Sequence, residues 1–262
     1  MAKDISAVNK SIDTQANAVK ASAAIAPPEH RSYRAAIFQG YIVLAIIIFL
    51  VLAVLAHTIA YFTFDVTITR ALQTIDSSWF AAFMYGVSWI GFVPQKIAII
   101  VAVLVFLYAS GLKWETIVSV VSVLGISALE FSIKQLVDRP RPAADLVNVI
   151  RQLTDYSFPS GHVLFFTTFF GFLLFLAYTL LKPMWWRTVL IIIFGALVGL
   201  VGLSRIYEGQ HWASDVFAAY LLGSVWLGLS IYIYRRGKAR FFVNQPTAKA
   251  TPDSAGSSPQ PS

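Results

Sequence analysis

The sequence contains no cysteine among its 262 residues, which excludes disulfides, thiolate metal sites and cysteine nucleophiles. Charged residues are scarce and make up 13% of the chain, against about 25% in a typical soluble domain. The first residues lack the order of a charged segment, an apolar segment and a cleavage site that marks a signal peptide. We find no internal repeat. The low charge content argues against a soluble domain and turns attention to the apolar residues.

Hydrophobic residues make up 57% of the chain and gather in long runs, which is typical of a membrane protein. Backbone groups in hydrocarbon must be paired within their own segment, so each run should be a helix. We therefore predict an all-α, polytopic membrane protein built as a six-transmembrane-helix bundle. The six predicted spans cover about 39–62, 97–108, 117–137, 163–181, 189–203 and 216–234.

Three segments fall outside these spans. Residues 79–92 combine two tryptophans with small and polar residues, which favours a helix lying in the membrane interface. Residues 1–34 are polar and alanine-rich, and residues 241–262 are rich in Pro, Ser, Thr and Ala. We expect both to be disordered tails, which leaves 35–240 as the membrane domain.

Basic residues beside short loops indicate the orientation of the bundle. Lys113, Lys182, Arg187 and the cluster at 235–240 would share one side with the N-terminal tail if there are six spans, so this side should be cytoplasmic. The loops at about 63–96, 138–162 and 204–215 would then face outward. The net charge of +7 is spread over tails and loops beside the membrane, so we predict no nucleic-acid partner.

The outward loops contain three clusters of chemically active residues, at 134–142, 159–162 and 204–215. Lys134, Arg141 and Arg205 would bring three cations to one membrane face, and an arginine fork matches the oxygens of a phosphate. Ser160 and Gly161 follow a proline and should open a helix, whose free N–H groups also suit an anion. The clusters together predict a phosphate site.

Two histidines in these loops are candidates for the chemistry. Asp215 follows His211 by four residues, so a helical segment would place both side chains on one face. The carboxylate could then hold one imidazole nitrogen as N–H and leave the other free to attack. His162 could act as general acid toward a leaving alkoxide.

The three clusters resemble the signature of the type-2 phosphatidate phosphatase (PAP2) superfamily. That signature is Lys, six residues, Arg-Pro; then Pro-Ser-Gly-His; then Ser-Arg, five residues, His, three residues, Asp. The segments 134–142, 159–162 and 204–215 match every position. The resemblance covers about 41–234, and the residues of the third cluster are similar to those of bacterial members.

The resemblance implies a phosphohistidine mechanism without metal or cofactor. His211 would attack phosphorus, Asp215 would orient it, and His162 would protonate the leaving oxygen and later activate water. The phosphate would be held by Lys134, Arg141, Ser160, Gly161 and Arg205. The implied substrate is a phosphorylated lipid: undecaprenyl pyrophosphate, phosphatidate or phosphatidylglycerophosphate. The implied location is the bacterial inner membrane; nothing indicates the oligomeric state.

Other interpretations remain open. The same site could pass phosphate to an alcohol instead of water. Charges near helix ends also occur in transporters, although there they gather near the bilayer midplane. A metal hydrolase could use His162, His211 and Asp215 as ligands, but few other carboxylates are near.

Several polar residues have simpler expected roles. Glu130 precedes Lys134 by one turn, and we expect a structural ion pair between them. We interpret Arg139 as a loop cation and His57 as a polar group satisfied between helices. The phenylalanines of 165–172 should pack between helices or contact lipid.

Overall fold

The computed structural model describes residues 28–242, and within this range every regular element is helical. The all-α prediction is confirmed. The first described helix is α2 (Pro28–Thr58) and the last is α10 (Ala213–Phe242). Most of both predicted tails, 1–34 and 241–262, lies outside the described residues.

Five helical segments are long and apolar enough to cross a membrane: Ala35–Thr58 in α2, α6 (Lys113–Val137), Gly161–Leu180, α9 (Trp185–Tyr207) and Ala213–Arg240 in α10. A further pair, α4 (Ser78–Trp89) and α5 (Val93–Ala109), is long and apolar enough when the two helices are taken together, but the chain bends by 57° between them. Counted as one broken span, the pair completes the six spans expected from the sequence. The helix expected over 79–92 is present as α4, and the expected span at 97–108 lies within α5.

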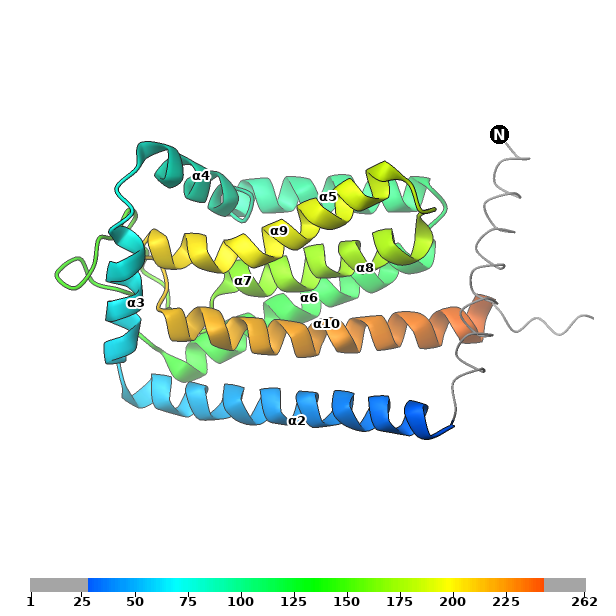
Figure 1. Ribbon diagram of the computed structural model, residues 1–262, viewed down its shortest axis with the longest axis horizontal. Helices are drawn as coiled ribbons and strands as arrows, with labels where there is room; N and C mark the ends of the chain where they lie inside the picture. The colour runs from blue at the N-terminus through cyan, green and yellow to red at the C-terminus, as the bar shows by residue number, and fades with distance from the viewer. Residues whose placement is uncertain (1–27, 243–262) are drawn as a thin grey trace, which may run out of the picture.

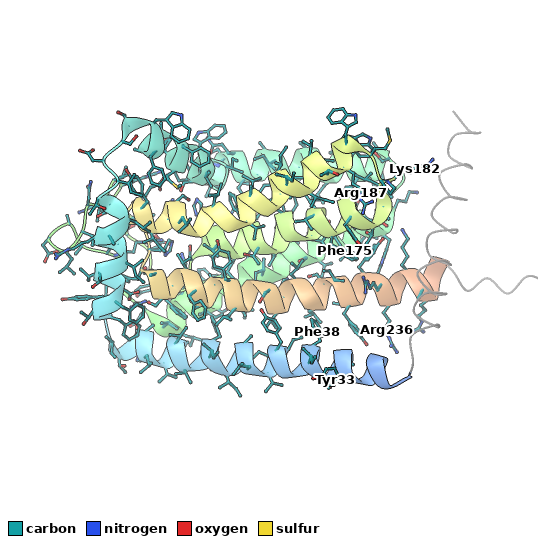
Figure 2. The ribbon with its side chains drawn as sticks, viewed as in Figure 1. Tyr33, Phe38, Phe175, Lys182, Arg187 and Arg236 are labelled. Carbon is teal, nitrogen blue, oxygen red and sulfur yellow. The ribbon has the colours of Figure 1, made fainter. Side chains whose placement is uncertain are left out.

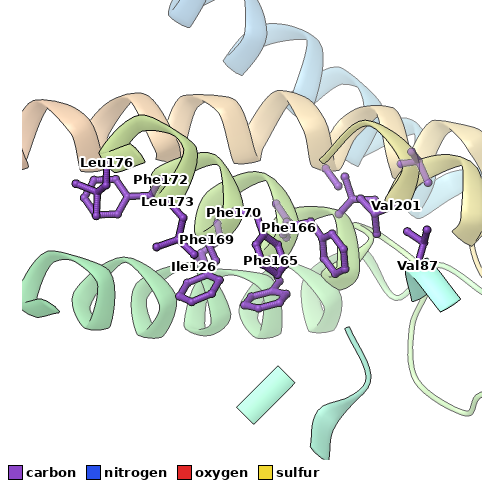
Figure 3. Packing of buried hydrophobic residues seen from close by; sticks show 14 of the residues in the cluster. Val87, Ile126, Phe165, Phe166, Phe169, Phe170, Phe172, Leu173, Leu176 and Val201 are labelled. Carbon is purple, nitrogen blue, oxygen red and sulfur yellow. The ribbon is translucent and has the colours of Figure 1, made fainter. Parts of the chain in front are cut away.

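The segment Gly161–Leu180 lies at the centre of the bundle. It consists of α7 (Gly161–Phe165), a π-helical turn η1 (Phe166–Phe170) and α8 (Gly171–Leu180). In its apolar 18-residue stretch 67% of the residues are buried, against 11–28% in the corresponding stretches of the other four spans. Its phenylalanines form the core with residues of α6 and α9 (Figure 3). A helix that is apolar all round belongs in the interior, so the predicted packing role of these rings is confirmed.

The sequence analysis did not predict one of the helices. Residues 63–96 were expected to form a loop with an interfacial helix, but α3 (Thr63–Gln73) lies at its start and crosses the end of the bundle (Figure 1). Its Asp65 carboxylate accepts a hydrogen bond from the Phe62 N–H, 3.2 Å away, which caps the helix. Asp65 and Thr69 are both fully buried, so the helix turns an acidic residue inward.

The two ends of the bundle differ in character. Helix α3 and the long connection between α6 and α7 lie at one end (Figure 1). Lys182, Arg187 and Arg236 lie at the opposite end (Figure 2). The basic residues used to predict the cytoplasmic side therefore gather away from the three clusters.

Candidate active site

The three sequence clusters meet at the end of the bundle that carries α3. They surround a cavity of about 400 Å³ lined by residues of α5, α6, α7, α9 and the connecting loops. Six of the eight predicted site residues line it: Lys134, Arg141, Gly161, His162, Arg205 and His211. Ser160 and Asp215 are fully buried. The segments are distant in sequence, and the fold brings them to one place.

His211 lies in the turn between α9 and α10 with its two ring nitrogens in different surroundings. Nδ1 is 2.8 Å from the backbone carbonyl oxygen of Ser157. A carbonyl only accepts, so Nδ1 carries the proton. Nε2 lies 3.2 Å from Nη1 of Arg141 and faces the cavity. Burial, helped by the nearby guanidinium groups of Arg141 and Arg205, holds the pKa of His211 well below its usual range. The ring is therefore neutral, and its unprotonated Nε2 accepts from the Arg141 guanidinium.

Asp215 supports this turn by a different route from the expected one. His211 precedes α10 instead of lying in it, so the two residues do not share a helical face. The Asp215 Oδ2 atom is 3.7 Å from Nδ1 of His211, farther than a hydrogen bond. It accepts from the backbone N–H of Trp212, 3.0 Å away, and from the Ser157 hydroxyl. Asp215 thus holds the backbone N–H of Trp212, which follows His211, and the hydroxyl of Ser157, whose carbonyl contacts the imidazole directly.

Arg139 is a buried part of this support, which corrects its interpretation as a loop cation. Its side chain is 1% exposed. The guanidinium forms ion pairs with Asp215 and with Asp65, the latter at 2.9 Å. It also donates to the Ser214 hydroxyl and to the carbonyl of Ala60. Buried charges require such pairing, so Arg139 joins α3 to the first turn of α10.

Lys134 and Arg141 share a carboxylate that the sequence analysis did not single out. Asp155 lies 2.7 Å from the Lys134 ammonium and 2.8 Å from the Arg141 guanidinium. Burial tends to raise the pKa of Asp155, but hydrogen bonds from Arg141 and Lys134 outweigh it and keep the pKa below its usual range. The predicted pair of Glu130 with Lys134 is confirmed at 3.4 Å. Two carboxylates therefore hold these cations in place at the cavity.

The start of α7 presents polar atoms without protein partners to the same region. Among the described residues, His162 Nε2, Ser160 Oγ and Arg205 Nε are buried and have no hydrogen-bond partner. Buried polar atoms are rarely left unpaired, and a catalytic role or a bound ion or water commonly accounts for those that are. A Cβ at Gly161 would come within 2.0 Å of the Glu130 carboxylate, so a larger residue there would displace the side chain that pairs with Lys134. The arrangement suits a small anion with several oxygens.

The family of the chain follows from comparison with known proteins. The sequence profile described as the PAP2 superfamily matches residues 114–238, which contain all three clusters. Phosphatidylglycerophosphatase B of Bacillus subtilis is 27% identical over 179 residues, 67% of this chain and 85% of that protein. The chain belongs to the PAP2 superfamily. The resemblance seen in the motifs is thereby confirmed.

Other PAP2 relatives agree. Undecaprenyl-diphosphatase of Sulfolobus acidocaldarius is 44% identical over 87 residues, 32% of this chain and 36% of that protein. The crystal structure of a transmembrane PAP2-type phosphatidylglycerolphosphate phosphatase from Bacillus subtilis aligns with a TM-score of 0.65 and 26% identity, covering 76% of this chain and 98% of that one. Aquifex aeolicus LpxE aligns with a TM-score of 0.53 and 24% identity, covering 66% and 98%, and shows the fold alone. This PAP2 chain is a membrane-embedded lipid phosphatase.

The PAP2 site also bears on the other interpretations. The charged cluster lies at helix ends and in loops at one end of the bundle, where a transporter site near the midplane would not be. Both oxygens of Asp215 are engaged by N–H, O–H or guanidinium donors, so this carboxylate is committed to holding the turn. His57 lies at the end of α2, half exposed, and contacts Asp138 at 2.9 Å.

Proposed function

We propose that this PAP2 phosphatase removes phosphate from its lipid through a phosphohistidine formed on His211. The observation that carries the proposal is the imidazole of His211, which donates from Nδ1 to the Ser157 carbonyl and accepts at Nε2 from Arg141. A nucleophile needs an unprotonated nitrogen beside a site that holds its target. Arg141, Lys134 and Arg205 line the cavity on which Nε2 opens.

The first chemical step forms the bond between His211 Nε2 and phosphorus and breaks the bond from phosphorus to the lipid oxygen. His162 protonates that oxygen as it leaves. The cations Lys134, Arg141 and Arg205 balance the charge on the transferred phosphoryl group, together with the Ser160 hydroxyl and the N–H group of Gly161. Asp215 keeps the turn of His211 in place.

The second step hydrolyses the phosphohistidine. His162, now neutral, takes a proton from water, and the resulting hydroxide attacks phosphorus from the face that the lipid oxygen left. The bond to Nε2 breaks, and inorganic phosphate is released. The sum of both steps is lipid phosphate plus water giving lipid alcohol plus phosphate. No residue of the chain is changed at the end of the cycle.

The substrate proposed for the site is an amphiphilic phosphate or diphosphate ester. Phosphatidylglycerophosphate and undecaprenyl diphosphate are suggested by the names of two relatives, and phosphatidate by the motifs. The cavity itself has apolar walls from Phe92, Val93, Ile150 and Leu153 beside its cationic floor. Such a wall accepts the first carbons of a lipid tail while the phosphate meets the cations.

The activity is tested by incubating the purified full chain with these three lipids in detergent micelles, with a strong chelator present. We expect release of inorganic phosphate from at least one lipid, undiminished by the chelator, since the proposed steps use only protein groups and water. Vanadate should inhibit, because its trigonal-bipyramidal form mimics phosphorus during transfer. Activity that disappears with chelator and returns with a divalent ion would overturn the mechanism.

The proposed orientation places the active-site end outside the bacterial inner membrane and both chain ends in the cytoplasm. We expect a cysteine introduced by Ala144→Cys, in the exposed loop at the active-site end, to react with a membrane-impermeant thiol reagent in intact cells. Lys182→Cys, exposed at the opposite end, should react only after lysis. The wild-type chain has no cysteine and provides the blank. The reverse labelling pattern would show that the site faces inward.

A further inference from the structure

Two cations line the active-site cavity without a carboxylate partner. Lys96 stands in the first turn of α5, and Arg151 in the connection between α6 and α7. Both line the same cavity as His162 and His211. The other three cations of this cavity are each paired with an acidic side chain. Among the described residues, Lys96 and Arg151 take part in no ion pair and contact only aromatic rings through their charged groups.

The two cations stand on the His162 side of the cavity. The guanidinium of Arg151 lies 5.7 Å from the ring centre of Phe92, and that ring meets the His162 imidazole edge-on at 5.7 Å. The Lys96 ammonium lies 5.6 Å from the ring of Phe165, one helical turn after His162. At the break before α5, a Cβ on Gly91 would come within 2.3 Å of His162. The segment carrying Lys96 is therefore packed directly against this histidine.

The position of Lys96 and Arg151 beside His162 determines which part of the substrate they can contact in the proposed mechanism. His211 attacks phosphorus from one side, and His162 meets the leaving oxygen on the other. Charge placed beside His162 therefore acts on the leaving group rather than on the transferred phosphoryl group. Lys96 is half-buried beside this histidine and has no acidic partner among the described residues. An anionic leaving group would supply that partner.

We propose that Lys96 and Arg151 bind the lipid-attached phosphate of a lipid diphosphate, so that a diphosphate ester is the preferred substrate. The inference rests on the proposed function of His211 and His162. His211 Nε2 bonds to the terminal phosphorus, the bond from that phosphorus to the bridging oxygen breaks, and lipid monophosphate leaves. Water then releases the terminal phosphate from His211. The overall reaction converts lipid diphosphate and water into lipid monophosphate and inorganic phosphate.

The two cations would act on both binding and reaction. They attract the inner phosphate in the ground state, and they also stabilise the charge that develops on the bridging oxygen as it leaves. A lipid monophosphate places an uncharged carbon chain in the same position and gains neither effect. Discrimination between the two substrates should therefore depend on Lys96 and Arg151, while Lys134, Arg141 and Arg205 serve both substrates alike.

The test compares a prenyl diphosphate with the monophosphate of the same prenyl chain, using the full-length protein in micelles. Lys96→Gln, Arg151→Gln and the double variant are measured by initial release of inorganic phosphate. Each single change should lower kcat/KM for the diphosphate by about 10-fold to 100-fold, the range for hydrogen bonds to charged groups. The monophosphate should change by less than about 3-fold, since it makes no such bond.

Matched controls separate local charge from total charge and from folding. Lys113→Gln and Arg236→Gln remove the same charges from exposed positions outside this cavity, and both substrates should keep their wild-type rates. Lys96→Arg retains the charge and should retain most of the diphosphate activity. The monophosphate rate of each variant also reports whether it is folded.

Several results would overturn the inference. Equal losses on both substrates would mean that the two cations support the fold or the transferred phosphoryl group. Wild-type protein that hydrolyses the monophosphate but not the diphosphate would refute the diphosphate preference and leave the proposed function standing. Rapid turnover of inorganic pyrophosphate with no action on prenyl diphosphate would assign the pair to a soluble diphosphate. Failure on every phosphorylated lipid would instead refute the proposed function itself.

Discussion

His211→Ala should lower phosphatase activity by about 10⁴-fold or more, the size of loss seen when a covalent nucleophile is removed. No bond to phosphorus can form without the Nε2 lone pair, so the loss should be the same for lipid substrates and for p-nitrophenyl phosphate. The protein should stay folded, because the imidazole occupies a turn at the edge of the cavity and contributes little to the apolar core.

The measurement is single-turnover formation of phosphoenzyme with a phosphate-labelled lipid, followed by quenching in base, where phosphohistidine survives. His57→Gln is the matched control, since His57 is half exposed and lies outside the cavity. Labelled protein from the control but not from His211→Ala is the expected result. Label retained by His211→Ala would move the nucleophile to another residue.

His162→Ala should fail in a different way. The alkoxide that leaves from a lipid monophosphate is a poor leaving group and needs the proton from His162, a contribution of about 10²–10⁴-fold. The p-nitrophenolate ion leaves without such help, so phosphoenzyme formation from p-nitrophenyl phosphate should fall much less. Equal losses on both compounds would give His162 a binding role instead of proton transfer.

The sequence predicts the membrane helices well because each span must bury apolar side chains in lipid or in the core. It misses α3 because that helix alternates apolar residues with Asp65, Thr67 and Arg70, and no long hydrophobic run marks it. The bend between α4 and α5 is also not evident from composition. These two elements are the ones that close the active-site end.

The motif residues are predictable because their types and spacing are specific. The residues that hold the motif side chains in place are not predictable in this way. Asp155 and Ser157 belong to a connection without a regular element, and only the folded chain brings them to Arg141 and His211. Asp65 lies 150 residues before Asp215 in sequence (215 − 65), and the two share Arg139 only once α3 packs on α10. The only sequence feature that indicates a role for Arg139 is the repeated Arg-Pro dipeptide at 139–142.

The second large effect concerns that shared arginine. Arg139→Met should lower the free energy of unfolding by about 3–5 kcal/mol, the usual result of removing one partner from buried ion pairs. Asp65 and Asp215 are both fully buried and would lose their common counter-charge. The turn that carries His211 should also lose its fixed position, because Arg139 holds the carboxylate that holds this turn. We therefore expect kcat to fall more than KM rises.

A double variant distinguishes charge pairing from simple loss of packing. Adding Asp65→Asn to Arg139→Met removes one of the two unpaired carboxylates, so part of the lost stability should return. A lost packing contact would not be restored by that change. Arg70→Met is the matched control, because Arg70 is exposed and, within residues 28–242, its side chain donates only to the Leu146 carbonyl. Stability is followed by thermal unfolding in detergent, and phosphate release by the lipid assay. Wild-type stability in Arg139→Met would mean that Asp65 and Asp215 do not need this cation, and the buried ion pairs would lose their assigned role.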